Sequence, residues 1–563
     1  WSKRLGKRAS ATKGDSPLSA LSWGVSPKSA AAERLARLGK ALKAKPQKAG
    51  RLASEAEAWL EDLAGTAAMP SVDLALVSVG WAHAIAAAAP LLEGEFWWRV
   101  VDQLRTLAES AQQVTPGEEA PVDESLVDQL LAGEIPLVLA AVLPEISPLR
   151  TGRKVAAAAL SEGVLALTDG EGLPPARCLP RLPLLLACWT RCRTIAESTS
   201  KRCWDADAET QYEWLVRQSL RLASADGAVA LSEPSASMPD LLHAAIKIAG
   251  DEADSAAAAR RLRPKPKKNS SADPPEPSVN SEWSGVAVLA AGWAPKAPRM
   301  TVAYAGSSMR LELMAGGQVA VSGDWPLDIT IDGVAAVADG EWEEQCWFSD
   351  EESDYLELAI DLENGARLER QLFLTREDGI GYVSEIVMTN ADEPAAIETN
   401  TRLVLGEKVV FHGEQETREG WLTVGKKRLA GMAPLALPEW RVDPRHGELT
   451  SESQTSGGET LGLSLLAVGR AQCSPLMLDF NVGRFAKQRT WRQLAVAEKL
   501  KRVGPDIAVG YRMQSGRDQW VVYRSLAGAA NRTVIGGNYS SESFIGRFLP
   551  TGEIEEYWEI EAQ

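Results

Sequence analysis

The chain has 563 residues, of which 45% are hydrophobic and 24% are charged, a composition typical of a soluble globular protein. Its formal net charge of −16 argues against a general nucleic-acid binder and against a polybasic membrane anchor. Six cysteines are too few for a disulfide framework in a chain of this length. The length alone predicts roughly three or four domains.

The N-terminal segment 1–27, which begins "WSKRLGKRASATKG", is expected to be a flexible basic tail. No apolar run reaches about 18 residues, so no membrane span is predicted. The compartment stays open: a signal peptide ahead of this segment would indicate a periplasmic or secreted protein, and its absence a cytoplasmic one. The oligomeric state is open as well.

Residues 28–262 are predicted to form an all-α domain. Segments such as "SAAAERLARLGKALKA" and "EFWWRVVDQLRTLAESA" repeat apolar residues at i, i+3 and i+4, and Gly and Pro separate the segments that follow. Cys188 and Cys192, in "ACWTRCRT", would share one helix face. No CxxC pair and no nearby histidine accompanies them, so small buried hydrophobic residues are favoured over zinc ligands.

A segment rich in Pro, Lys and Ser predicts a linker at 263–282. Residues 283–563 then contain many short strand-like runs, such as "RMTVAYA", "YLELAID" and "WVVYRSLA", bounded by Gly, Asp, Asn or Pro. Short strands without intervening helices predict a large antiparallel β-sandwich. The expected architecture is therefore an all-α domain followed by an all-β domain.

The segment "ARLERQLFLTREDGIGYVSEIVM" at 366–388 predicts a β-hairpin. Leu368 and Leu372 share one face of its first strand, and Arg370 lies between them on that face. A four-residue loop would place Arg370 directly opposite Glu385 on the second strand. Because either charge buried alone would be costly, we predict an ion pair between them rather than contact with a substrate.

This hairpin and the order of the two domains resemble the heparinase II/III family of polysaccharide lyases. The resemblance implies an incomplete (α/α) toroid followed by a C-terminal β-sandwich. It also implies β-elimination on a uronic-acid glycoside, in which a base removes the C5 proton and an acid protonates the leaving oxygen. The implied partner is an acidic polysaccharide or oligosaccharide, and no cofactor is required, although a single divalent metal (zinc or calcium) is an option.

The family site implies a tyrosine and a histidine from the toroid, often with Asn, Glu or Arg on the substrate carboxylate. Residues 1–268 contain no asparagine, one tyrosine (Tyr212) and two histidines (His83 and His243). The candidate catalytic pair is therefore Tyr212 with His83, His243 being the less favoured alternative. Tyr212 lies on the apolar stripe of its helix, so packing in the core is the competing interpretation.

The candidate substrate-binding residues are Arg191, Arg217 and Trp189, and a position on an exposed helix face is the favoured alternative for the arginines. His412, near Glu414 and Glu416, is the candidate metal ligand from the β domain. Sugar stacking is a second theme, because the chain has 19 tryptophans and several lie beside charged residues in the β domain. These are Trp293, Trp325, Trp342, Trp347, Trp440, Trp491 and Trp520, and core packing is favoured for most of them.

Two functions remain open at this stage. The first is a polysaccharide lyase-like enzyme that acts on an acidic glycan by β-elimination. The second is a non-catalytic glycan-binding or scaffold relative that kept the fold and lost the catalytic residues.

Overall fold

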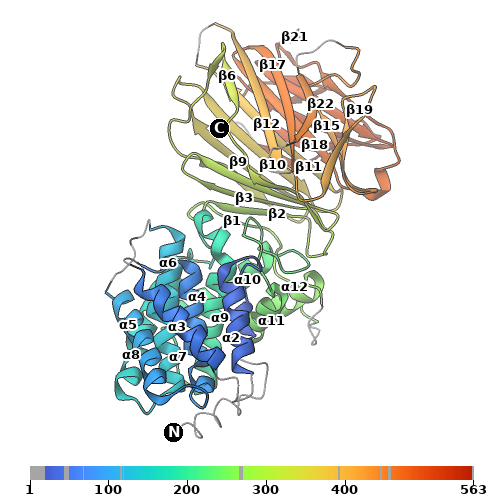
Figure 1. The fold of residues 1–563 in the computed structure, drawn as a ribbon. Helices are drawn as coiled ribbons and strands as arrows, with labels where there is room; N and C mark the ends of the chain where they lie inside the picture. Colours follow the sequence, from blue (N-terminus) through green and yellow to red (C-terminus); the bar gives the residue numbers. More distant parts are fainter. Residues whose placement is uncertain are drawn as a thin grey trace. The chain divides into compact units, whose positions relative to one another are not determined.

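A computed structural model describes residues 19–43, 50–66, 69–113, 117, 120–264, 271–390, 393–443, 447–453 and 458–560. The chain divides into two compact units, a helical unit within Trp1–Pro275 and a β unit within Glu276–Gln563 (Figure 1). Most of the expected tail at 1–27 and part of the expected linker at 263–282 lie outside the described residues, as does His446.

The helical unit contains short helical turns and longer α-helices, as expected for an all-α domain. They are η1 (Ala20–Ser22), α2 (Ala30–Leu42), α3 (Gly50–Ala64), α4 (Val72–Ala88), α5 (Gly94–Ala111), α6 (Val122–Asp128), the π-helix η3 (Gln129–Glu134), α7 (Ile135–Val142), α8 (Ser147–Ala166), η4 (Ala176–Arg181), α9 (Leu182–Thr199), α10 (Ala206–Leu222), α11 (Met238–Ala249) and α12 (Glu252–Arg261).

Two kinds of helix build this unit. Helices α4 and α7 and the first half of α9 are buried on nearly all sides, whereas α2, α3 and α5 bury one apolar stripe. Helix α4 packs against α2, α5 and α7, and α9 packs against η3, α7 and α11. This pattern of buried and amphipathic helices is that of an incomplete (α/α) toroid (Figure 1).

One segment of this unit, Val122–Val142, is long and apolar enough to cross a membrane by length and composition. It comprises α6, η3 and α7, and most of it is buried inside the unit, as in the core helix of a soluble protein. Acidic residues interrupt it, among them Asp128 and Glu134, so it is not a continuous apolar run.

The β unit contains antiparallel strands throughout its described part. They are β1 (Val279–Ser281), β2 (Val286–Ala290), β3 (Arg299–Ala305), β4 (Ser308–Ala315), β5 (Gln318–Asp324), β6 (Ile329–Ile331), β7 (Val334–Ala335), β8 (Glu343–Ser349), β9 (Ser353–Asp361), β10 (Arg367–Thr375), β11 (Ile380–Met388), β12 (Ala395–Val404), β13 (Val409–Gly413), β14 (Gly420–Val424), β15 (Lys427–Pro434), β16 (Gly447–Ser453), β17 (Glu459–Gly469), β18 (Ala471–Asp479), β19 (Arg489–Leu494), β20 (Ala497–Glu498), β21 (Lys501–Arg502), β22 (Ala508–Ser515), β23 (Asp518–Ser525), β24 (Arg532–Val534), β25 (Gly537–Tyr539), β26 (Ser543–Phe548) and β27 (Ile554–Ile560), with the short turn η5 (Val482–Arg484) before β19.

An eight-stranded sheet, in the order β13-β14-β15-β18-β11-β10-β9-β8, lies in the middle of this unit. On one face, Leu368 and Leu372 join a core with the sheets β1–β5 and β16-β17-β12-β6-β7. On the other face, Phe373 and Tyr382 join a second core with the sheet β19-β22-β23-β26-β27. The prediction of an α domain followed by a β-sandwich is confirmed, and the sandwich has an additional layer.

The predicted hairpin is confirmed with its register. Strands β10 and β11 pair so that Arg370 lies opposite Glu385, and Leu368 lies opposite Val387. The guanidinium of Arg370 donates from Nε and Nη2 to Oε1 of Glu385, at 3.0 and 2.7 Å, and both side chains are buried. Arg370 is therefore a structural residue of the sandwich, as the spacing predicts.

Candidate functional site

A buried charged cluster lies at the centre of the helical unit, at the end of the π-helix η3. Glu134 is fully buried, and Arg191 of α9 donates to its two oxygens from Nε and Nη2, both at 2.7 Å. His83 of α4 places Nε2 at 2.9 Å from Oε1 of the same carboxylate. The structure thus brings together two of the predicted site residues, His83 and Arg191, on a glutamate that the sequence did not single out.

The electrostatics of this cluster favour a charged glutamate. Burial alone would raise the pKa of Glu134, but the charge and hydrogen bonds of Arg191, with a smaller contribution from His83, lower that pKa to about 2. The carboxylate is therefore already neutralised by Arg191 at neutral pH. Its bond with His83 occupies Nε2, one of the two ring nitrogens of that histidine.

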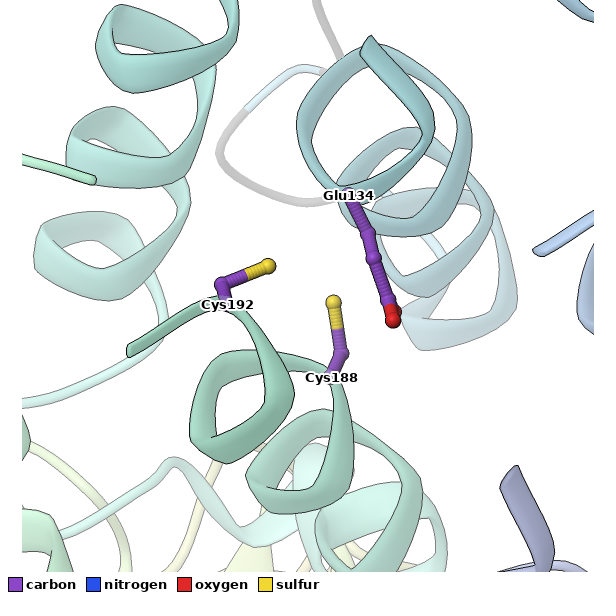
Figure 2. A group of neighbouring side chains, drawn as sticks. All are labelled: Glu134, Cys188 and Cys192. Atoms are coloured by element: carbon purple, nitrogen blue, oxygen red, sulfur yellow. The ribbon is translucent and has the colours of Figure 1, made fainter. Parts of the chain in front are cut away.

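Two cysteines lie beside this carboxylate. Glu134, Cys188 and Cys192 each offer one atom that could bind a metal ion, and these atoms lie within 4.8 Å of one another (Figure 2). No other group of three potential metal ligands is found in the described part of the chain. Thiolates with a carboxylate suit zinc better than calcium. However, burial raises the pKa of both thiols, and Arg191 occupies both carboxylate oxygens. The residues present therefore fit a buried ion pair packed against thiols better than a metal centre.

The predicted catalytic tyrosine lies inside the helix packing. Tyr212 has no exposed surface, its hydroxyl lies 2.9 Å from Oγ1 of Thr190, and its ring packs against Trp204. Burial raises the pKa of its phenol. A substrate sugar has no access to this hydroxyl in the structure.

The other substrate-binding candidates also have partners within the protein. Trp189 is fully buried, and its Nε1 donates to Oε1 of Gln129 at 3.0 Å. Arg217 donates from Nε to Asp254 at 2.7 Å and from Nη2 to Asp251 at 2.5 Å. The arrangement gives these two residues structural partners on η3 and at the start of α12.

The two other histidines in the described part of the chain are His412 of β13 and His243 of α11. His412 is exposed on β13 and pairs in register with Trp421, and it does not belong to a group of three metal-ligating side chains among the described residues. A metal role for His412 therefore stays a prediction. His243 has a buried Nε2 with no hydrogen-bond partner among the described residues, and burial lowers its pKa.

A cleft of about 420 Å³ opens elsewhere on the helical unit. Its walls come from the segment before α2, the first turns of α4, α6 and α9, and the loop at 233–235. Arg181 crosses it, donating to Asp123 from Nε at 2.7 Å and from Nη2 at 3.2 Å, and also pairing with Glu233. None of the predicted site residues lines this cleft.

The charges in the cleft are mixed. Its lining includes two cations, Lys28 and Arg181, and three acids, Asp73, Asp123 and Glu233. Asp73 and Asp123 lie in the first turns of α4 and α6, where the helix dipole stabilises a carboxylate. The cleft therefore offers hydrogen-bonding groups for a polar ligand without an excess of positive charge.

Sequence reasoning missed Glu134, Gln129 and Arg181. A signal for Glu134 was present, because it is an acidic residue inside the apolar stretch "LLAGEIPLVLAAVL", where an unpaired charge would be costly. The sequence carries no comparable signal for Arg181, whose partners lie 58 and 52 residues away.

The chain has the fold of heparinase-type polysaccharide lyases, as the resemblance implies. A crystal structure of heparinase III matches with a TM-score of 0.60 at 10% identity, over 88% of this chain and 83% of that one. The heparan sulfate lyase HepC of Pedobacter heparinus matches with a TM-score of 0.56 at 11% identity, over 88% and 81% of the two chains. A further heparinase III gene product matches at 0.57 and 11%, over 93% and 84%.

Neither a protein-family model nor a curated protein sequence matches the chain. The TM-scores of 0.56 and 0.60 indicate a shared fold. Sequence identities of 10–11% do not assign an activity to this chain.

Proposed function

We propose that this protein is a polysaccharide-binding relative of the heparinase-type lyases that does not catalyse β-elimination. The observation that carries the proposal is the position of Tyr212, the only tyrosine in residues 1–268, whose hydroxyl is buried against Thr190. A proton donor or acceptor has to reach the reacting atom, directly or through one water. The tyrosine of the expected pair has no such access.

The histidine of the expected pair is also engaged. His83 is held by Glu134, and Arg191, the expected partner of a substrate carboxylate, donates from Nε and Nη2 to the same glutamate. Releasing Arg191 toward a substrate would leave the buried Glu134 with His83 as its remaining side-chain partner, at a cost of about 3–5 kcal/mol. The cluster is therefore better suited to stability than to turnover.

The fold supports a polysaccharide as the ligand, and the charges in the cleft indicate which kind of polysaccharide would bind. The solved structures with this fold are named as a heparan sulfate lyase and as heparinase III, which supports a polysaccharide ligand for this chain. The cleft beside Arg181 offers carboxylates, hydroxyls and two cations but no net positive charge. We expect it to accept a neutral or weakly acidic polysaccharide more readily than a highly sulfated one.

The test combines a turnover assay with a binding assay on the full chain. Polygalacturonate, alginate, heparan sulfate and the neutral polysaccharide glucomannan would be incubated with the protein, and the ultraviolet absorbance of unsaturated uronate followed. We expect no absorbance increase on any of them and retention of at least one of them by the immobilised protein. Release of unsaturated uronate by the wild type, abolished in Tyr212→Phe at unchanged thermal stability, would overturn the proposal and restore the lyase interpretation.

A further inference from the structure

A second pocket lies in the β unit and contains an exposed tryptophan. Its volume is about 390 Å³, and it is lined by residues 436–440, Asp443 and residues 491–493. Trp440 is 49% exposed there. By contrast, five of the tryptophans that the sequence offers for sugar stacking are buried: Trp293, Trp325, Trp342, Trp491 and Trp520.

The loop that carries Trp440 is held in place by a buried arginine. Arg418 donates from Nη1 to the carbonyl oxygens of Pro438 at 3.1 Å and Trp440 at 2.5 Å, and from Nη2 to that of Asp443 at 3.0 Å. Arg418 is only 6% exposed, so these three bonds are shielded from water. The position of the Trp440 backbone is therefore fixed before any ligand arrives, which lowers the entropic cost of binding.

The floor of the pocket is also fixed. Trp491 is buried, and its Nε1 donates to the carbonyl oxygen of Leu437 at 2.8 Å, which ties β19 to the Trp440 loop. Glu439, Trp440, Arg492 and Gln493 therefore all line one pocket whose backbone is held in place on two sides.

We propose that this pocket binds a sugar ring of a polysaccharide, with Trp440 stacking on the ring face. A pyranose presents an apolar C–H face and a rim of hydroxyl groups, so it needs an aromatic surface next to hydrogen-bonding side chains. Glu439 and Asp443 accept from hydroxyl groups, while Arg492 and Gln493 donate to them. With two acids and one cation, the pocket suits a neutral hexose better than a sulfated one. This inference rests on the proposed polysaccharide-binding function and locates a binding site for it.

The test measures binding of cellohexaose, mannohexaose and a heparan sulfate hexasaccharide to the full chain by isothermal titration calorimetry. We expect a neutral probe to bind more tightly than the sulfated one, and Trp440→Ala to weaken that binding roughly tenfold or more, the scale of one aromatic anchor. Trp440→Phe should retain most of the affinity. Trp283→Ala is the matched control, because Trp283 is 62% exposed in the same unit and lies outside the pocket lining.

Two results would overturn the inference: binding of a probe that Trp440→Ala leaves unchanged, or no binding of any probe by the wild type. The first leaves the proposed function intact, because it shows binding at another site. Release of unsaturated uronate would instead contradict the proposed function, because it would show that the protein catalyses β-elimination. It would leave the inference about Trp440 unchanged. Equal melting temperatures of the two alanine variants exclude misfolding as the cause of a lost affinity.

Discussion

The buried pair of Arg370 and Glu385 allows the contribution of one charge in the β unit to be measured. Glu385→Gln would keep the shape of the side chain and remove its charge, leaving Arg370 charged at zero exposure. The arginine would keep its bonds to the carbonyl oxygens of Trp325 and Pro326, both at 2.7 Å. It would also keep the indole faces of Trp325 and Trp342, whose ring centres lie 4.3 and 4.9 Å from its guanidinium carbon.

Removing one member of a buried pair costs about 3–5 kcal/mol in free energy of unfolding. Because Arg370 keeps two carbonyl partners and two aromatic faces, we place Glu385→Gln near the lower end, at about 3 kcal/mol. The cost of Arg370→Met should be near the upper end of this range, at about 5 kcal/mol. In this variant the buried Glu385 carboxylate keeps only its bond from Thr401, at 2.5 Å, and the carbonyl oxygens of Trp325 and Pro326 lose their donor. The double variant should cost less than the sum, with a coupling of about 2 kcal/mol.

The assay is urea-dependent hydrogen exchange of the full chain, followed by mass spectrometry on peptides that cover β10 and β11. Tryptophan fluorescence would report on both units, because the helical unit has its own tryptophans. Exchange measured on these peptides reports on the β unit alone. Arg402→Met is the control, because Arg402 pairs with Asp328 at 2.7 Å but is 52% exposed, and we expect a loss below about 1 kcal/mol. A loss in Glu385→Gln no larger than that control, or strict additivity in the double variant, would refute the reasoning.

Two further predictions concern the helical unit. Burial raises the pKa of Asp128 from 3.8 to about 6, so the native state binds a proton more tightly than the unfolded state, and the free energy of unfolding falls as pH rises between those values. Asp128→Asn has no carboxyl group to titrate, so its free energy of unfolding minus that of the wild type should increase by roughly 2 kcal/mol from about pH 4.5 to pH 7. A difference that does not change with pH would contradict the raised pKa of Asp128. Gly163→Ala should destabilise by about 1–3 kcal/mol although alanine favours helices, since its Cβ would lie 2.1 Å from the buried Gln129 amide. Gly152→Ala in the same helix meets nothing closer than 3.8 Å and should be neutral or stabilising; equal thermal shifts of the two variants would contradict the packing argument.

Local patterns accounted for the features that depend on neighbouring residues. The two-residue period of β10 and β11, with the cost of an unpaired charge, was enough to predict the Arg370–Glu385 pair and its register. The helical period likewise offered core packing as the alternative for Tyr212, which is where the structure places its side chain.

Long-range contacts explain what sequence reasoning could not find. Glu134 receives partners 51 and 57 residues away, and a π-helix rather than an α-helix sets its direction. The pocket around Trp440 depends on Trp491 and on the buried Arg418, which no periodic pattern connects to it. Such sites form where loops and strands that are distant in the sequence come into contact. The periodicity of residues in a single sequence predicts local elements and does not predict these contacts.

The central sheet of the β unit has a consequence for how this unit comes apart. Successive residues of β10 belong to different apolar cores, Leu372 to one and Phe373 to the other. Neither core can lose this strand without exposing the other, so the two cores are thermodynamically linked through β9, β10, β11 and β18. The outer sheets cannot melt independently while they cover this shared layer, and the β unit should disassemble as a single cooperative block rather than layer by layer.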